Sequence, residues 1–189
     1  NKLIMVGEKG HGNQSFPCSF DFRYYKDIYI VKTNLNGAAL WQKTHGNEYL
    51  EKGTDIVAKE GGGYIIAGEK CDHGYNISSC DNRAKIILLE IDEDGNSNQE
   101  TVLNNLYFFE AGSPISISNT SNGGYVFVSK PKNNGYTWFY KWGQNENSID
   151  LKLENAGYGG ESIEMSNDGG FIIGTSGSTI IKTDQELNF

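Results

Sequence analysis

The chain has 189 residues, a formal net charge of −8 and a sequence pI near 4.9. This length suffices for one domain with its own core or for part of a repeat array. The acidic balance disfavours a nucleic-acid partner, and the apolar runs of about five residues are too short to insert in a membrane, which takes roughly 20.

A seven-residue phrase recurs along the chain. It reads GGYIIAG at 62–68, GGYVFVS at 123–129 and GGFIIGT at 169–175, and LIMVG at 3–7 is a copy without the glycine pair. Each copy is a short β-branched and aromatic run bounded by glycine, which is typical of a buried strand. Because the phrase repeats, it indicates a repeat architecture.

Further predicted strands surround each copy of the phrase. Three strands precede a copy and join it through Asn-Gly, Asp-Gly or Gly-Gly hairpins: 55–58, 116–118 and 162–165. Four strands follow a copy: 27–33, 85–91, 138–142 and 179–183. A fourth type completes the unit at 40–44, 100–103 and 149–152.

Four antiparallel strands per unit, repeated, predict an all-β fold, a β-propeller of four-stranded blades. A β-sandwich would not explain four copies. The blades are expected at 1–45 (partial), about 53–104, about 113–153 and 160–189 (partial). We name the strand before the phrase A, the phrase itself B, and the two strands after it C and D. The chain then reads BCD, ABCD, ABCD, ABC, which predicts a segment of a larger propeller. The alternative is a propeller that these four blades close by themselves.

The spacing Asn34-x-x-Gly37-x-x-x-Trp41 resembles the D-x-x-G-x-x-x-W signature of pyrroloquinoline-quinone-type propeller repeats. Together with GG[YF]IIxG and the Val-Lys-Thr that ends at Thr33, it is similar to repeats of secreted bacterial propeller proteins. The resemblance implies an extracellular or cell-surface location. The second copy departs from it, because Gln99 replaces the tryptophan. Kelch propellers rank lower, since their glycine pair follows the apolar strand.

Long loops are predicted on one face only, at 8–26, 69–84, 45–53 and 104–113. Aromatic and arginine side chains in such loops are typical recognition anchors, although they could equally pack the loops against each other. The candidate binding residues are His11, Phe20, Phe22, Arg23, Tyr24, Tyr25, Asp72, His73, Tyr75, Asp81 and Arg83. The aromatic run at 136–142 alternates along a predicted strand and is expected in the core.

Three cysteines allow one disulfide, and Cys71–Cys80 is the candidate because it closes a short loop. Cys18 is then left over, and three unpaired thiols are an alternative. A zinc site of Cys71, His73 and Cys80 is disfavoured because it lacks an evident fourth ligand.

We expect no catalytic residues, no cofactor and no metal. The acidic stretch at 92–98 is read as a hairpin turn rather than a calcium loop. The expected function is a non-catalytic module that binds a protein or a glycan, or a structural or adhesin component of a larger assembly. The alternative is a propeller enzyme, quinone-dependent or glycoside-acting, for which Asp72 and Asp81 would be the available carboxylates.

Overall fold

The structure is a computed structural model that describes residues 2–10, 26–47, 50–71, 84–103, 115–129, 137–143, 149–154 and 159–188, with backbone alone for 137–138 and 149–154. In these residues every regular element is a β-strand. The chain forms two compact units, the first made of Asn1–Ile56 and Gly62–Tyr107 and the second of Val57–Gly61 and Phe108–Phe189.

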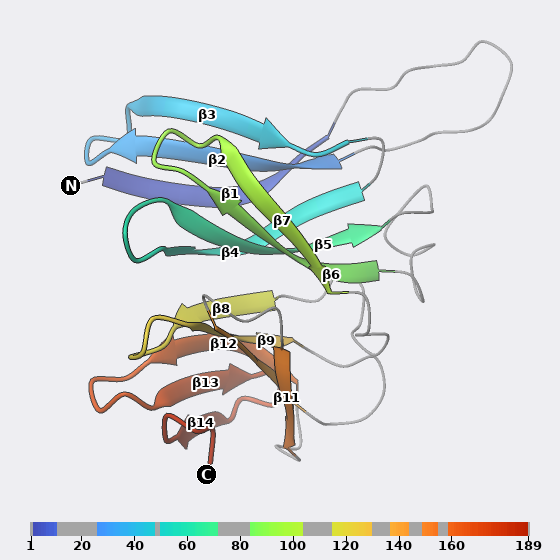
Figure 1. Ribbon diagram of the computed structural model, residues 1–189, viewed down its shortest axis with the longest axis vertical. Coiled ribbons are helices and arrows are strands. Elements are labelled where there is room, and N and C mark those ends of the chain that lie inside the picture. Colours follow the sequence, from blue (N-terminus) through green and yellow to red (C-terminus); the bar gives the residue numbers. More distant parts are fainter. Residues whose placement is uncertain are drawn as a thin grey trace, which may run out of the picture. The chain divides into compact units, whose positions relative to one another are not determined.

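The first unit contains two antiparallel meanders (Figure 1). We use the word blade as a label for one meander: blade 1 consists of β1 (Lys2–Gly10), β2 (Lys26–Asn34) and β3 (Ala39–His45). Blade 2 consists of β4 (Leu50–Ala58), β5 (Tyr64–Cys71), β6 (Ala84–Ile91) and β7 (Ser97–Leu103). A single parallel pairing, Lys26 with Leu50, links the two meanders.

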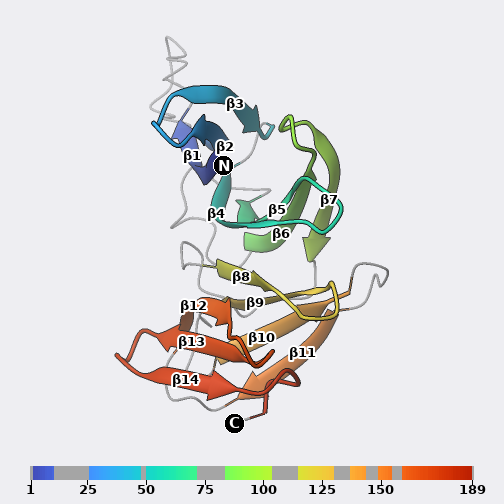
Figure 2. The same cartoon turned by 90° about the vertical axis from the view of Figure 1, so that its left-hand side faces the viewer.

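The second unit also contains two antiparallel meanders, here in separate sheets of four and three strands (Figure 2). Blade 3 consists of β8 (Ile115–Asn119), β9 (Tyr125–Ser129), β10 (Thr137–Trp142) and β11 (Ile149–Glu154). Blade 4 consists of β12 (Gly160–Met165), β13 (Phe171–Thr175) and β14 (Ile180–Thr183). The all-β prediction is therefore confirmed, and the described strands fall into antiparallel meanders of three, four, four and three strands.

Each unit has an apolar core between its two blades. In the first unit, Ile28 and Ile30 of blade 1 pack on Ile66, Ile87 and Leu89 of blade 2. In the second unit, a cluster of buried residues joins blade 3 to blade 4: Val126, Val128, Phe139, Ile163, Phe171, Ile173 and Leu187. Alternate strand residues point to one face, so the period-two pattern of each strand produces these cores.

The predicted core role of the aromatic run on β10 is confirmed where it is described. Phe139 and Tyr140 are 0% and 1% exposed, and Tyr140 stacks on Phe127 with ring centroids 4.6 Å apart. Trp142 is half-buried. Tyr136 and the side chain of Trp138 lie outside the described residues.

The two glycines of the recurring phrase have different tasks. The first takes a left-handed turn conformation, with φ of +83° at Gly123 and +84° at Gly169. The second lies against the end of the third strand of its blade: a Cβ on Gly170 would stand 2.0 Å from the Thr183 carbonyl oxygen, and one on Gly124 would stand 2.9 Å from that of Trp142. The predicted hairpins are confirmed, and the second glycine is explained by close approach.

Several residues of the predicted loops belong to strands. Pairing continues to Gly10–Lys26 and to Cys71–Ala84, so residues 8–10, 26, 69–71 and 84 of the loops expected at 8–26 and 69–84 are strand residues. Likewise β4 begins at Leu50, whose side chain packs on Cys71. These strands extend beyond their apolar runs because ladder hydrogen bonds do not require apolar side chains.

Candidate functional site: a pocket among the turns of the second unit

A cavity of about 400 Å³ lies in the second unit, where turns of blades 3 and 4 meet. We call it the turn pocket. Its walls come from the β8–β9 turn at 120–124, the end of β10, the β12–β13 turn and the turn after β14. The pocket thus belongs to the hairpin turns, whereas the sequence pointed to the loops at the opposite ends of the strands.

One wall of the turn pocket is aromatic. Tyr125 and Trp142 are paired across β9 and β10, and their ring centroids lie 5.5 Å apart at an interplanar angle of 32°. Phe171 adds a third ring. Tyr125 and Phe171 are buried, while Trp142 is half-buried and keeps part of its surface accessible. These rings give the pocket a rigid apolar floor.

The β8–β9 turn supplies hydroxyl and amide groups. The Thr120 hydroxyl donates to Asn122 Oδ1 at 2.5 Å and accepts from the Gly124 amide at 2.8 Å. Ser121 and Asn122 are exposed at the pocket. Since the Thr120 hydroxyl braces the turn, these polar side chains stand on a fixed backbone.

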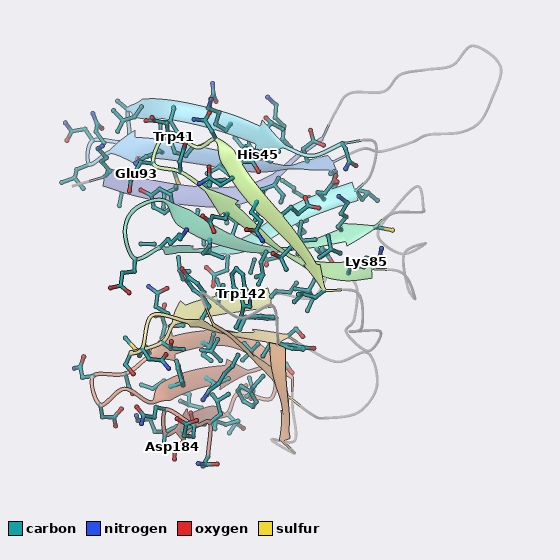
Figure 3. The ribbon with its side chains drawn as sticks, viewed as in Figure 1. Trp41, His45, Lys85, Glu93, Trp142 and Asp184 are labelled. Carbon is teal, nitrogen blue, oxygen red and sulfur yellow. The ribbon has the colours of Figure 1, made fainter. Side chains whose placement is uncertain are left out.

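The opposite side carries a charged pair. Lys141 Nζ lies 2.8 Å from Glu186 Oε2, with the two side chains 30% and 67% exposed. The turn that holds Glu186 is built on Asp184, labelled in Figure 3, whose Oδ1 accepts from the amides of Glu186 and Asn188 at 2.8 Å each. Gln185, exposed beside Glu186, completes this side of the turn pocket.

The composition of the turn pocket suits a polar ligand. Its volume falls within the range of small-molecule sites, roughly 300–1,000 Å³. Aromatic rings offer faces to C–H groups, while hydroxyl, amide, ammonium and carboxylate groups can donate to and accept from hydroxyls. Glu186 is the single carboxylate among the described residues that line it, whereas glycoside hydrolysis takes two.

A second polar cluster joins the two blades of the first unit (Figure 3). Lys32, only 2% exposed, donates to the Glu93 carboxylate and, at 3.0 Å, to the Glu93 carbonyl oxygen. Its Nζ lies 5.0 Å from the ring centroid of Tyr64 and 5.7 Å from that of Trp41. The ammonium is thus held between two aromatic rings and a carboxylate.

The β3 strand completes this junction. Trp41 Nε1 donates to the Glu93 carbonyl oxygen at 3.1 Å, and His45 Nε2 lies 2.9 Å from the Gly95 carbonyl oxygen. Burial lowers the pKa of Lys32, but the hydrogen bonds of Glu93 and Tyr64 outweigh it and raise the pKa overall. The hydrogen bond from Lys32, with that from the Gly63 amide, lowers the pKa of Glu93. Both pKa shifts favour the charged forms of the ion pair that joins the two blades.

The residues predicted as the binding face all lie outside the described residues, and their grouping remains a prediction. They are His11, Phe20, Phe22, Arg23, Tyr24, Tyr25, Asp72, His73, Tyr75, Asp81 and Arg83. The strand ends next to these segments carry buried acids. Glu51 is 2% exposed, and burial raises the pKa of its carboxyl against the opposing effect of Lys70, 3.5 Å away.

Cys71 is disulfide-bonded. Both other cysteines, Cys18 and Cys80, lie outside the described residues, so the Cys71–Cys80 pairing remains a prediction. A disulfide sulfur is not a thiolate, which removes one ligand from the zinc alternative.

The acidic stretch at 92–98 forms the predicted hairpin turn. Asp92 Oδ1 accepts from the amides of Asp94 and Asn96 at 2.9 Å and 2.8 Å. Among the described residues there is no group of three or more His, Cys, Asp or Glu that could hold a metal ion. In the same part of the chain, no helix is long and apolar enough to cross a membrane.

Fold and site together define the chain as an all-β protein of repeated antiparallel meanders with a polar and aromatic pocket. No family model matches the sequence, and no curated protein matches it. A crystal structure of a protein of unknown function from Bacteroides caccae aligns with 97% of this chain at 10% identity and a TM-score of 0.50, which is a likeness of fold alone. The chain spans 55% of that protein's length. A structure of YCF48 bound to a D1 peptide aligns with 87% of this chain and 61% of its own at 11% identity and a TM-score of 0.38.

Proposed function

We propose that this chain is a non-catalytic β-propeller module that binds a glycan in the turn pocket. The observation that carries the proposal is the pocket itself, in which Tyr125 and Trp142 face hydroxyl, amide and charged groups of rigid turns. A saccharide combines C–H faces with many hydroxyls, and this lining offers partners for both.

The propeller assignment rests on the four meanders with one strand order. The packing of Trp41 on the next blade's turn supports the resemblance to pyrroloquinoline-quinone-type repeats, because the signature tryptophan is the docking residue.

An extracellular or cell-surface location is part of the proposal. The disulfide at Cys71 supports it, because structural disulfides form and persist mainly in oxidising compartments. A protein partner on the predicted loops at 8–26 and 69–84 is a separate prediction.

A glycan array probed with the purified chain tests the proposal. The informative variant is Gln185→Ala, since Gln185 is exposed at the pocket and its truncation removes one donor and one acceptor without opening the core. We expect selective glycan binding that weakens about tenfold, a loss of roughly 1.4 kcal/mol. Asn36→Ala, in an exposed turn of blade 1, is the matched control and should leave binding unchanged. Equal binding by both variants would place the glycan elsewhere, and no binding to any glycan would refute the proposal.

A further inference from the structure

The face of blade 4 that points away from blade 3 has the residue pattern of a buried face. Lys182 pairs with Ile172, and Ile180 pairs with Gly174, so Ile172, Ile180 and Lys182 share this face. We call these three residues the blade 4 outer face. The two isoleucines are 44% and 77% exposed.

The same three positions in blade 1 are covered. Ile30 and Lys32 lie on one face of β2, and Lys32 pairs with Ile4. Ile30 and Lys32 are 0% and 2% exposed, and Ile4 packs against the core shared with blade 2. There the lysine binds Glu93 in the turn of the following blade.

Blade 3 repeats the arrangement. Phe139 and Lys141 share a face of β10, and Lys141 pairs with Val126. Phe139 and Val126 are both 0% exposed in the core shared with blade 4. The lysine again reaches an acid, Glu186, in the turn of the following blade. Two junctions therefore use one rule: two apolar residues are covered, and one lysine meets a carboxylate of the next turn.

Lys182 is the third copy of this lysine. In the described structure it binds Asp168 of its own blade, with Nζ 2.6 Å and 2.8 Å from the two carboxylate oxygens. This pair is exposed, with side chains 46% and 66% accessible, so breaking it costs little.

We propose that the blade 4 outer face is a docking surface for a further blade of this repeat. In that blade, the turn between the third and fourth strands presents a carboxylate to Lys182. The occupant must cover Ile172 and Ile180 with an apolar sheet face and replace Asp168 as the partner of Lys182. Covering the isoleucines as Phe139 and Val126 are covered removes apolar surface from water, which drives the association.

Blade 1 of a second copy fits this description only in part. Its face away from blade 2 is apolar, with Leu3, Met5 and Leu40 at 50–51% exposure. Its turn lacks the acid, however. Asn34 Oδ1 accepts from the amides of Asn36 and Ala38, as Asp92 does from Asp94 and Asn96, so Leu35 stands where Glu93 stands. The charge pattern thus favours a further blade over a second copy of this chain.

The missing acid provides a test with the whole 189-residue chain. In Leu35→Glu, blade 1 acquires the turn carboxylate, and one copy should dock on blade 4 of the next, a head-to-tail contact. Sedimentation velocity over a range of concentrations should show at least tenfold stronger self-association than for the neutral control Leu35→Gln. Adding Lys182→Glu should abolish the gain, and Leu35→Lys with Lys182→Glu should restore it.

Three results would overturn the inference. The first is a folded Leu35→Glu chain that associates no more than Leu35→Gln. The second is a gain that Lys182→Glu leaves intact. The third is a wild-type chain that already associates through Lys182, because a second copy without the carboxylate would then be the occupant. Circular dichroism confirms the fold of each variant, and all substituted residues are exposed.

Discussion

The indole ring of Trp41 lies against Gly95 in the turn of the next blade. A Cβ on Gly95 would stand 2.9 Å from Cη2 and Cζ3 of that ring, so the tryptophan requires the glycine. The corresponding positions of the second unit hold different residues. The residue paired with Lys141, at the Trp41 position, is Asp150, and the position of Gly95 is taken by Leu187, which is 2% exposed. The positions of Trp41 and Gly95 in the first junction therefore correspond to those of Asp150 and Leu187 in the second.

Trp41→Ala should lower the free energy of unfolding by about 2 kcal/mol, somewhat below the usual cost of truncating a buried tryptophan, because Trp41 is only half-buried. Urea denaturation measures the change. Leu40→Ala is the control, since its side chain is 50% exposed, and it should change the free energy by less than about 0.5 kcal/mol. Equal losses in the two variants would contradict docking by Trp41.

Gly170→Ala should destabilise the protein by about 2 kcal/mol or more. Its new Cβ would meet the Thr183 carbonyl oxygen at 2.0 Å and the Asp184 Cα at 3.1 Å, and neither backbone atom can move away freely. Gly7→Ala has nothing within 4 Å of its Cβ and should be neutral or slightly stabilising. Thermal unfolding compares the two. A neutral Gly170→Ala would show that the second glycine of the phrase is dispensable.

Two residues with positive φ should respond oppositely to glycine. Ser178 has φ of 60° and is exposed, so Ser178→Gly should stabilise by up to about 1 kcal/mol through relief of the left-handed conformation. Leu187 has φ of 62°, but its side chain is buried in the core. Its loss costs about 2–3 kcal/mol, more than the relief supplies, so Leu187→Gly should destabilise. Calorimetric midpoints that shift in the same direction would contradict this balance.

The contribution of Glu93 should depend on pH. Its pKa is lowered in the folded state, chiefly by the hydrogen bond from Lys32. The carboxylate therefore contributes stability above the ordinary glutamate pKa of about 4.3, and this contribution is lost as the pH falls through the folded value. The destabilisation caused by Glu93→Gln should shrink between pH 6 and pH 3 in urea titrations. In a Lys32→Met background that pH dependence should disappear, and its persistence would assign it to another partner.

The repeated phrase was sufficient to predict the strands and their order, because β-branched runs and turn glycines act locally. The side-chain contacts between neighbouring blades were harder to predict from the sequence. The Lys32–Glu93 pair joins residues 61 positions apart, and only the register of two blades brings them together. The turn pocket was missed for the same reason, since its walls come from turns separated along the chain. A sequence signal for a difference between the two junctions was available. Asp150 and Leu187 occupy, in the second unit, the positions of Trp41 and Gly95 in the first.

The measurement that tests the account most directly is a glycan titration followed by amide and indole NMR signals of the assigned chain. We predict that the indole N–H of Trp142 and the side-chain amide of Gln185 shift together on binding, while the indole N–H of Trp41, which bonds Glu93 in the first unit, does not. Shifts confined to residues 11–25 and 72–83, or the absence of any shift, would contradict a glycan site in the turn pocket.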